Sequence, residues 1–358
     1  MKKSSIPFVG LHAHSVAGSP FDALGYPQDH MDYAYENGGE ALALTDHGNM
    51  NGMAYQVLHA KKMKEEGKNF KPIFGVEAYF IPSLDVWNEE RDRAKTDKKR
   101  ASELKDSTTM SVENEGETKR SKSILNQRSH LILLAQNQTG LNNIFAMISK
   151  SNSDKYFFRY PRVDYEVLRE HSEGVIAASA CMGGVYAANF WKHWDGEKEI
   201  VTDPEACTDA FRETTRRMVD IFGDRWYGEL QWHTDKKQHL INKLVIQMHK
   251  EFGIKLISTA DSHYPTPTAW KDRELYKRLG FLGKGKPSWL SDELPESVAE
   301  VGYELYPKNG DQMWESYKHY SELVGEDYDD DLVMDSITET HNIAFNRIEE
   351  LMPDNEVR

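Results

Sequence analysis

The chain has 358 residues, 39% of them hydrophobic and 28% charged, which is enough to bury a large core as one domain or two. The formal net charge of −14 argues against a protein that grips nucleic acid by bulk positive charge alone. No apolar run is long enough to span a bilayer, and no signal peptide is evident. Only two cysteines are present, which predicts a reducing cytoplasm.

Short apolar, β-branched runs recur along the chain and mostly alternate with helical patterns. They predict seven strands, over 8–11, 41–45, 72–80, 130–134, 174–178, 226–230 and 255–259. The predicted helices between them are 29–37, 53–66, 141–150, 210–222 and 237–252. Gly38, Gly67 and Gly253 stand where helices commonly end. Strand–helix alternation is typical of parallel strands, and seven repeats without a Gly-x-Gly-x-x-Gly loop favour a closed or nearly closed α/β barrel.

Two regions depart from this alternation. Residues 85–128 are rich in Lys, Glu, Asp, Ser and Thr with little periodicity, which predicts a flexible charged insertion. After residue 285 the rhythm stops, and residues 336–352 are amphipathic at helical spacing. We therefore expect a barrel domain over 1–285 and an acidic, mostly helical appendage over 286–358.

Nine candidate metal ligands lie near the ends of the predicted strands. They are His12, His14, Asp22, His47, Glu77, His130, Cys181, Asp261 and His263. In parallel barrels the chemistry gathers at the carboxyl ends of the strands. Imidazole, carboxylate and thiolate groups that converge on one pocket would hold more than one transition metal. This points to metal-assisted hydrolysis, with phosphate esters as the natural substrate class.

The spacing of the candidates supports this hypothesis to different degrees. His12 and His14 form a His-x-His pair, whose rings share one face of a strand, and Asp261-x-His263 repeats the spacing. His130 precedes its predicted strand, so this strand begins earlier or runs antiparallel to the others. Each doublet alone is weak evidence, and Cys181 alone is more commonly a small buried hydrophobic residue.

Other polar residues receive different interpretations. Asp46 is better explained as a group that orients His47 than as a ligand. We assign no metal role to the histidines on predicted helices or loops, which are His59, His171, His233, His239 and His249. No nucleophile elbow is present, which argues against a serine hydrolase.

Several motifs resemble the PHP domain (polymerase and histidinol phosphatase), in the branch at the amino terminus of bacterial replicative DNA polymerase III alpha subunits. The motifs are Ala-Leu-Ala-Leu-Thr-Asp-His-Gly-Asn-Met (41–50), Lys-Pro-Ile-Phe-Gly-Val-Glu-Ala-Tyr (71–79), His-Leu-Ile-Leu-Leu-Ala (130–135), Tyr-Pro-Arg-Val-Asp (160–164), Ser-Ala-Cys-Met-Gly-Gly (179–184), Glu-Leu-Gln-Trp-His (229–233) and Ala-Asp-Ser-His-Tyr (260–264). The resemblance implies a distorted seven-stranded, TIM-like (β/α) barrel in which all nine candidates bind three divalent metals, either Zn, Mn or Fe. Asp22 is the weakest ligand, because the segment after His14 looks about one residue longer than the family pattern.

The resemblance also implies a function. It favours a 3′–5′ exonuclease that proofreads the single-stranded 3′ end of DNA during replication, with a metal-bridging hydroxide attacking phosphorus. One alternative is a small-molecule phosphomonoesterase of the histidinol-phosphatase type. Another is a non-catalytic, metal-stabilised module that braces a separate polymerase chain or other replisome subunits. No palm domain follows, so we expect no polymerase activity and interpret the chain as an excised domain or one piece of a split polymerase, bacterial or phage-encoded.

Overall fold

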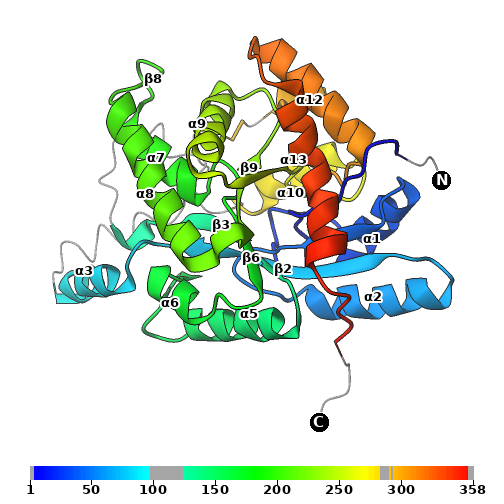
Figure 1. The fold of residues 1–358 in the computed structure, drawn as a ribbon, viewed down its shortest axis with the longest axis horizontal. Coiled ribbons are helices and arrows are strands. Elements are labelled where there is room, and N and C mark those ends of the chain that lie inside the picture. Colours follow the sequence, from blue (N-terminus) through cyan, green and yellow to red (C-terminus); the bar gives the residue numbers. More distant parts are fainter. Residues whose placement is uncertain (1–3, 97–123, 283–289, 292, 354–358) are drawn as a thin grey trace.

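The computed structural model describes residues 4–96, 124–282, 290–291 and 293–353, shown in Figure 1. The strands are β1 (Ala41–Leu44), β2 (Lys71–Phe80), β3 (Ser129–Ala135), β4 (Phe157–Phe158), β5 (Tyr160–Pro161), β6 (Val175–Ala178), β7 (Trp194–Asp195), β8 (Ile200–Val201), β9 (Trp226–Leu230) and β10 (Lys255–Ser258). The helices are α1 (Pro27–Glu36), α2 (Met53–Glu65), α3 (Leu84–Thr96), α5 (Gln138–Ser151), α6 (Tyr165–Glu170), α7 (Val185–His193), α8 (Pro204–Phe222), α9 (Lys236–Phe252), α10 (Trp270–Leu279), α11 (Val298–Val301), α12 (Gly310–Val324) and α13 (Asp330–Asn342). Short 3₁₀ turns are η2 (Ile124–Asn126) and η3 (Gly223–Arg225), and η4 (Ile343–Arg347) is a π-helical turn.

Six strands form one curled sheet in the order β1-β2-β3-β6-β9-β10, with helices packed around it (Figure 1). All neighbouring pairs are parallel except those of β3, which is antiparallel to both β2 and β6. The segment before α1 lies between the two edge strands: Ala43 N donates to Gly10 O at 2.8 Å, and His14 N donates to Ser262 O at 2.7 Å. This extended segment stands in the place of a seventh strand, so the sheet is a distorted barrel.

The structure confirms the predicted fold class and most of the predicted elements. Residues 8–11, predicted as a regular strand, make one isolated bridge to β1, from Gly10 to Leu42. Gly253 has a φ of +68°, the left-handed conformation that ends α9 without steric cost. The insertion predicted over 85–128 begins as α3, in which Trp87 is fully buried, and its residues 97–123 lie outside the described part of the chain.

Alternating side chains give the sheet two buried faces. In β3, Ile132 and Leu134 belong to the cluster inside the barrel, whereas Leu131 and Leu133 pack against the surrounding helices. The interior cluster also contains Tyr227 of β9 and apolar residues of β1, β2, β6 and β10. Strands covered on both faces explain why the sequence shows continuous apolar runs and little alternation.

The C-terminal helices belong to the same core. Ile343 and Ala344 of η4 and the following Ile348 are buried inside the barrel cluster, at the end opposite the carboxyl ends of the parallel strands. Lys71, the first residue of β2, donates to the carbonyl of Ala344 at 2.6 Å. The predicted helix over 336–352 instead begins at residue 330 and gives way to η4 at residue 343, and its apolar residues close the barrel. The division at residue 285 stays a prediction.

Candidate metal centre

The nine candidate residues meet at the carboxyl end of the parallel strands, inside the mouth of the barrel. His47 follows β1, Cys181 follows β6, and Asp261 and His263 follow β10. The prediction left two alternatives for His130. The structure shows that β3 both begins one residue earlier, at Ser129, and runs antiparallel, which puts its first residues at the same end of the barrel.

Glu77 is at the centre of the cluster. It lies three residues before the end of β2, on an inner position, and is fully buried. One carboxylate oxygen, Oε1, lies 3.3 Å from His12 Nε2 and 3.1 Å from His130 Nδ1, and Oε2 lies 3.4 Å from His14 Nε2 and 2.7 Å from His47 Nδ1. Burial alone would raise the pKa of Glu77, but the neighbouring histidine rings, His130 first, hold it well below its usual value.

The His-x-His pair converges as its spacing predicts. His12 Nε2 and His14 Nε2 lie 3.1 Å apart, and both lie 3.1 Å from Oδ1 of Asp261. On the other side of the His12 ring, Nδ1 lies 2.7 Å from Oε1 of the buried Glu229. A carboxylate at Nδ1 favours the tautomer in which Nε2 keeps its lone pair for the centre of the cluster.

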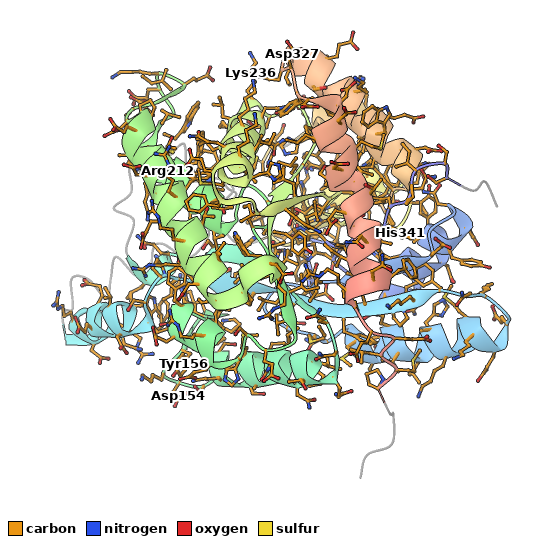
Figure 2. The ribbon with its side chains drawn as sticks, in the orientation of Figure 1. Asp154, Tyr156, Arg212, Lys236, Asp327 and His341 are labelled. Atoms are coloured by element: carbon orange, nitrogen blue, oxygen red, sulfur yellow. The ribbon has the colours of Figure 1, made fainter. Side chains whose placement is uncertain are left out.

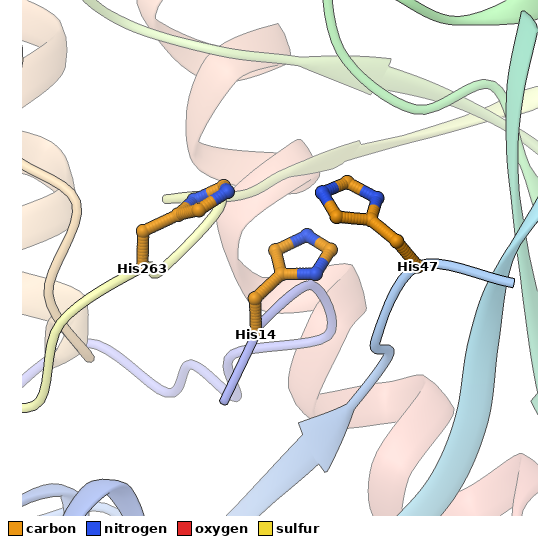
Figure 3. A group of neighbouring side chains, drawn as sticks. All are labelled: His14, His47 and His263. Atoms are coloured by element: carbon orange, nitrogen blue, oxygen red, sulfur yellow. The ribbon is translucent and has the colours of Figure 1, made fainter. Parts of the chain in front are cut away.

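His14, His47 and His263 come from three different segments, and their rings face a common space (Figure 3). His14 stacks on His47 with ring centroids 4.2 Å apart and lies 4.4 Å from His263. His263 Nδ1 lies 2.7 Å from the backbone carbonyl of Asp261, which leaves Nε2 directed at Asp22 Oδ2, 3.3 Å away. Asp22 Oδ2 is also 3.0 Å from His47 Nε2, so the candidate ranked weakest does join the cluster.

Cys181 lies at the opposite side of the cluster from Asp22. Its Sγ atom is 3.7 Å from His130 Nδ1 and accepts a hydrogen bond from Gly183 N at 3.4 Å. A Cβ atom on Gly183 would come within 3.0 Å of the His130 ring, so the glycine allows this loop to lie flat on the imidazole. Cys181 and Cys207 are both buried and free.

The surroundings shift the pKa values of His12 and His14 in opposite directions. Burial and the nearby His47 and His263 lower the pKa of His14 to about 3, so its ring is neutral at pH 7. Burial alone would lower the pKa of His12, but the carboxylates around it, Asp261 first, raise it well above its usual value. A cation bound among these carboxylates would neutralise their charge in place of the proton on His12.

Backbone strain is concentrated at the cluster. In the described part of the chain, five residues other than glycine have positive φ, and three of them are Phe21 (+66°), Ala180 (+59°) and Asp261 (+47°). Phe21 precedes Asp22, Ala180 precedes Cys181, and Asp261 is itself a candidate ligand. Strained backbone of this kind persists where the surrounding structure holds a functional side chain in place.

The hydrogen bonds of Asp46 run to two serines beside the cluster, and its role in orienting His47 stays a prediction. Its carboxylate does not hydrogen-bond the His47 ring; it accepts from Ser15 N at 2.7 Å and from the hydroxyls of Ser15 and Ser19 at 2.9 Å. Ser19 Oγ in turn lies 3.4 Å from His14 Nδ1 and accepts from His47 N at 3.2 Å. Asp46 therefore positions the loop that supports His14, because that loop folds back over the end of β1.

Sequence reasoning missed two charged residues beside the cluster. Glu229 was part of a recognised motif but received no role, although it follows the inward-facing Tyr227 by two residues and must therefore face inward too. Arg273 on α10 donates to both the carboxylate and the backbone carbonyl of Asp22 at 2.7 Å. No sequence signal links Arg273 to Asp22, since 251 residues separate them.

Substitution of Glu229 tests its support of His12. We expect Glu229→Ala to weaken metal binding or activity by about 10- to 100-fold, the usual effect of removing the hydrogen-bond partner of a ligating histidine. Glu229→Gln should lose less metal affinity or activity than Glu229→Ala, because the amide oxygen can still accept a hydrogen bond from His12 Nδ1. Titration of the purified variants with Mn²⁺ or Zn²⁺ measures the effect, and an alanine variant with the affinity of the wild type would contradict it.

The arrangement fits metal ions. Three overlapping groups among the described residues bring ligand atoms within 4.8 Å of one another: His14/His47/His263, His12/His14/Asp261 and His47/Glu77/His130. Both carboxylate oxygens of Glu77 and Oδ1 of Asp261 are buried and make no well-aligned hydrogen bond to any described residue. Buried anionic oxygens without such bonds are costly unless a cation satisfies them.

A cleft of about 1600 Å³ opens above the cluster. Asp22, His47, His130, Cys181, Asp261 and His263 lie on its floor, with Arg128, Lys236 and Arg273 among the basic residues and Phe21, Tyr79 and Tyr160 among the aromatic residues that line it. Lys236 is at the amino end of α9, labelled in Figure 2. Arg128 stacks on Tyr160, with the guanidinium carbon 4.0 Å from the ring centroid. The cleft joins the cluster to solvent.

Comparison with known proteins identifies the family. The DNA polymerase III subunit alpha of Helicobacter pylori strain J99 is 32% identical over 311 residues, which cover 87% of this chain and 22% of that protein. The corresponding subunit of Aquifex aeolicus is 31% identical over 262 residues, which cover 73% of this chain and 18% of that protein. The chain thus spans about a fifth of the length of these relatives.

A solved amidohydrolase from Chromobacterium violaceum aligns with 75% of this chain and 96% of its own, but a TM-score of 0.35 at 15% identity supports no argument. No helix in the described part of the chain is both long and apolar enough to cross a membrane. The model of the PHP domain matches residues 10–233, well over half of the chain. This chain therefore belongs to the PHP domain family.

Proposed function

We propose that the chain is a metal-dependent phosphoesterase that removes nucleotides from the 3′ end of DNA. The observation that carries the proposal is the convergence of ring nitrogens and buried carboxylate oxygens on the floor of a wide cleft. Divalent metals in such a site neutralise phosphate charge and lower the pKa of a bound water. The nine residues named above would hold the metals, three in number, with Asp22 and Cys181 at the two sides of the cluster.

The shape of the cleft favours a polymer over a small phosphomonoester. Pockets for small molecules commonly enclose about 300–1,000 Å³, whereas this cleft has about 1600 Å³ and opens to solvent. Its basic and aromatic lining, including Arg128 and Tyr160, suits the phosphates and bases of a single strand. These side chains also supply locally the attraction that a net charge of −14 does not give the whole chain.

We further propose that the chain works beside a separate polymerase chain in the cytoplasm, where proofreading would require it. Its relatives are DNA polymerase III alpha subunits of which it spans about a fifth. Bracing that partner is compatible with hydrolysis at the cleft. A chain recovered from its native host without a polymerase would count against this partner.

The decisive experiment follows release of the terminal nucleotide from 3′-labelled and 5′-labelled single-stranded oligonucleotides with Mn²⁺ or Zn²⁺, with metal content measured on the same preparation. We expect metal-dependent release of the 3′ label before the 5′ label. The His12→Ala and Asp261→Ala variants should lose this activity. His59→Ala is the matched control, because His59 pairs with Asp32 on α1, away from the cluster. Activity unchanged in His12→Ala would defeat the proposal, and turnover of small phosphomonoesters alone would favour the phosphatase alternative.

A further inference from the structure

The members of the cluster differ in their exposure to solvent. The side chains of His12, His14 and Glu77 are at most 1% exposed, whereas that of Asp22 is 40% exposed. His47, at 15%, is intermediate. A phosphodiester in the cleft meets the most exposed of these carboxylates at Asp22, so the residues next to Asp22 are placed to contact its flanking groups.

Phe21 occupies this position and is an unusual surface residue. It lines the cleft, is 53% exposed and sits next to Asp22 with a φ of +66°. A bulky residue in the left-handed region is strained, and a polar residue or glycine would suit the solvent-facing position better. The structure therefore holds an aromatic ring at the mouth of the cleft despite its unfavourable backbone conformation and exposed apolar surface.

The ring of Phe21 is held in a fixed orientation. It stacks on Tyr276 of α10, with centroids 5.4 Å apart and an angle of 21° between the planes. Gly280 packs against its Cβ atom, where a side chain at position 280 would come within 3.0 Å. Arg273, also on α10, fixes the next residue through the carboxylate and the carbonyl of Asp22. A rigid ring loses little conformational entropy when it binds a flat partner.

We infer that Phe21 is the stacking platform for the nucleobase next to the scissile phosphodiester. This inference rests on the proposed function and narrows it, because a platform of this kind selects a nucleotide over a phosphate ester without a base. Bases of any sequence present a π-face, so stacking on Phe21 positions the 3′ end without reading its sequence. Phe21 is a positioning residue, and the chemistry remains with the cluster beneath it.

The test compares two single-stranded oligonucleotides that differ only in the 3′-terminal nucleotide, which carries a base in one and is abasic in the other. The wild type should cleave the oligonucleotide with the terminal base faster and bind it more tightly. Phe21→Ala should reduce this preference over the abasic oligonucleotide by at least about fivefold, the lower range for loss of one base–aromatic stack. Phe21→Trp should retain it, and Phe21→Leu, which keeps apolar bulk against Tyr276, should lose it. Phe157→Ala is the matched control, because Phe157 is 41% exposed on β4 and does not line the cleft.

Binding gives a second readout that does not need turnover. The fluorescence of an oligonucleotide ending in 2-aminopurine should be quenched on binding to the wild type and to Phe21→Trp. Phe21→Ala should quench this fluorescence much less while keeping the thermal stability of the wild type. Equal preference in the wild type and Phe21→Ala would overturn the platform while leaving the exonuclease intact. A wild type that cleaves neither oligonucleotide would instead overturn the proposed function.

Discussion

Glu77→Gln should abolish metal-dependent hydrolysis with little change in the shape of the site. The carboxylate of Glu77 faces four histidines, and no other described carboxylate lies against as many histidines of the cluster. An amide keeps the volume but removes the negative charge that a cation requires. Loss of several kcal/mol of metal-derived transition-state stabilisation corresponds to a fall in kcat/KM of about 10³-fold or more. Elemental analysis and the oligonucleotide assay on one preparation measure both consequences.

The control for Glu77→Gln is another buried carboxylate. Asp164→Asn removes a charge of similar burial, but Asp164 caps α6 by accepting from Val167 N at 3.0 Å and lies outside the cluster. We expect this variant to lose some stability and to keep its metal content and kcat/KM. If Glu77→Gln retained the full metal complement and rate, Glu77 would be a structural residue and the centre of the site would lie elsewhere.

The convergence of the candidate ligands could be predicted from the sequence because its signals are local. His-x-His and Asp-x-His spacings put both side chains of each pair on one face, and His12 and His14 converge accordingly. His47 follows β1 and Glu77 lies near the end of β2, two strands with clear apolar runs, and parallel strands bring such positions to one end of the barrel. Even the anomalous position of His130 indicated the antiparallel β3 as one of two alternatives.

Features that depend on distant partners could not be predicted. The contact of Arg273 with Asp22 exists only because α10 folds back over the cleft. The serine partners of Asp46 depend on a loop that approaches so closely that a Cβ on Gly18 would lie 2.4 Å from Asp46 Cβ. Helices α7 and α10 were missed because short segments carry little periodic signal, and tertiary packing decides their conformation.

The end of the chain shows the same distinction between local pattern and packing. The apolar spacing over 336–352 correctly predicted that this segment has a buried face, because Ile337, Ile343 and Ala344 are fully buried. The pattern alone could not show which surface they cover. In the structure Ile343 and Ala344 cover the interior of the barrel, whereas Ile337 packs in the cluster between the sheet and the surrounding helices. Val9 N also donates to Thr340 Oγ1 at 3.0 Å. Ile343 and Ala344 thus complete the barrel core, at the end opposite the candidate metal centre.

Removal of residues 330–358 should therefore unfold the barrel, although the segment contributes no candidate ligand. Val333, Ile337, Ile343 and Ile348 are buried in the two main apolar clusters. Full burial of each such side chain contributes about 1.5–3 kcal/mol, so the four together contribute on the order of 6–12 kcal/mol. The whole free energy of unfolding of a domain is typically about 5–15 kcal/mol. Circular dichroism and thermal unfolding of the truncated chain measure the loss.

Two point variants separate loss of the core from the general effects of truncation. Ile343→Ala leaves a cavity at the closed end of the barrel and should lower the free energy of unfolding by about 2–5 kcal/mol. Leu323 on α12 is 61% exposed, so Leu323→Ala should change the free energy of unfolding by less than about 0.5 kcal/mol. A truncated chain that kept its ellipticity and cooperative transition would show that residues 1–329 fold alone. Because η4 lies opposite the cleft, Ile343→Ala should spare metal binding wherever the protein is still folded.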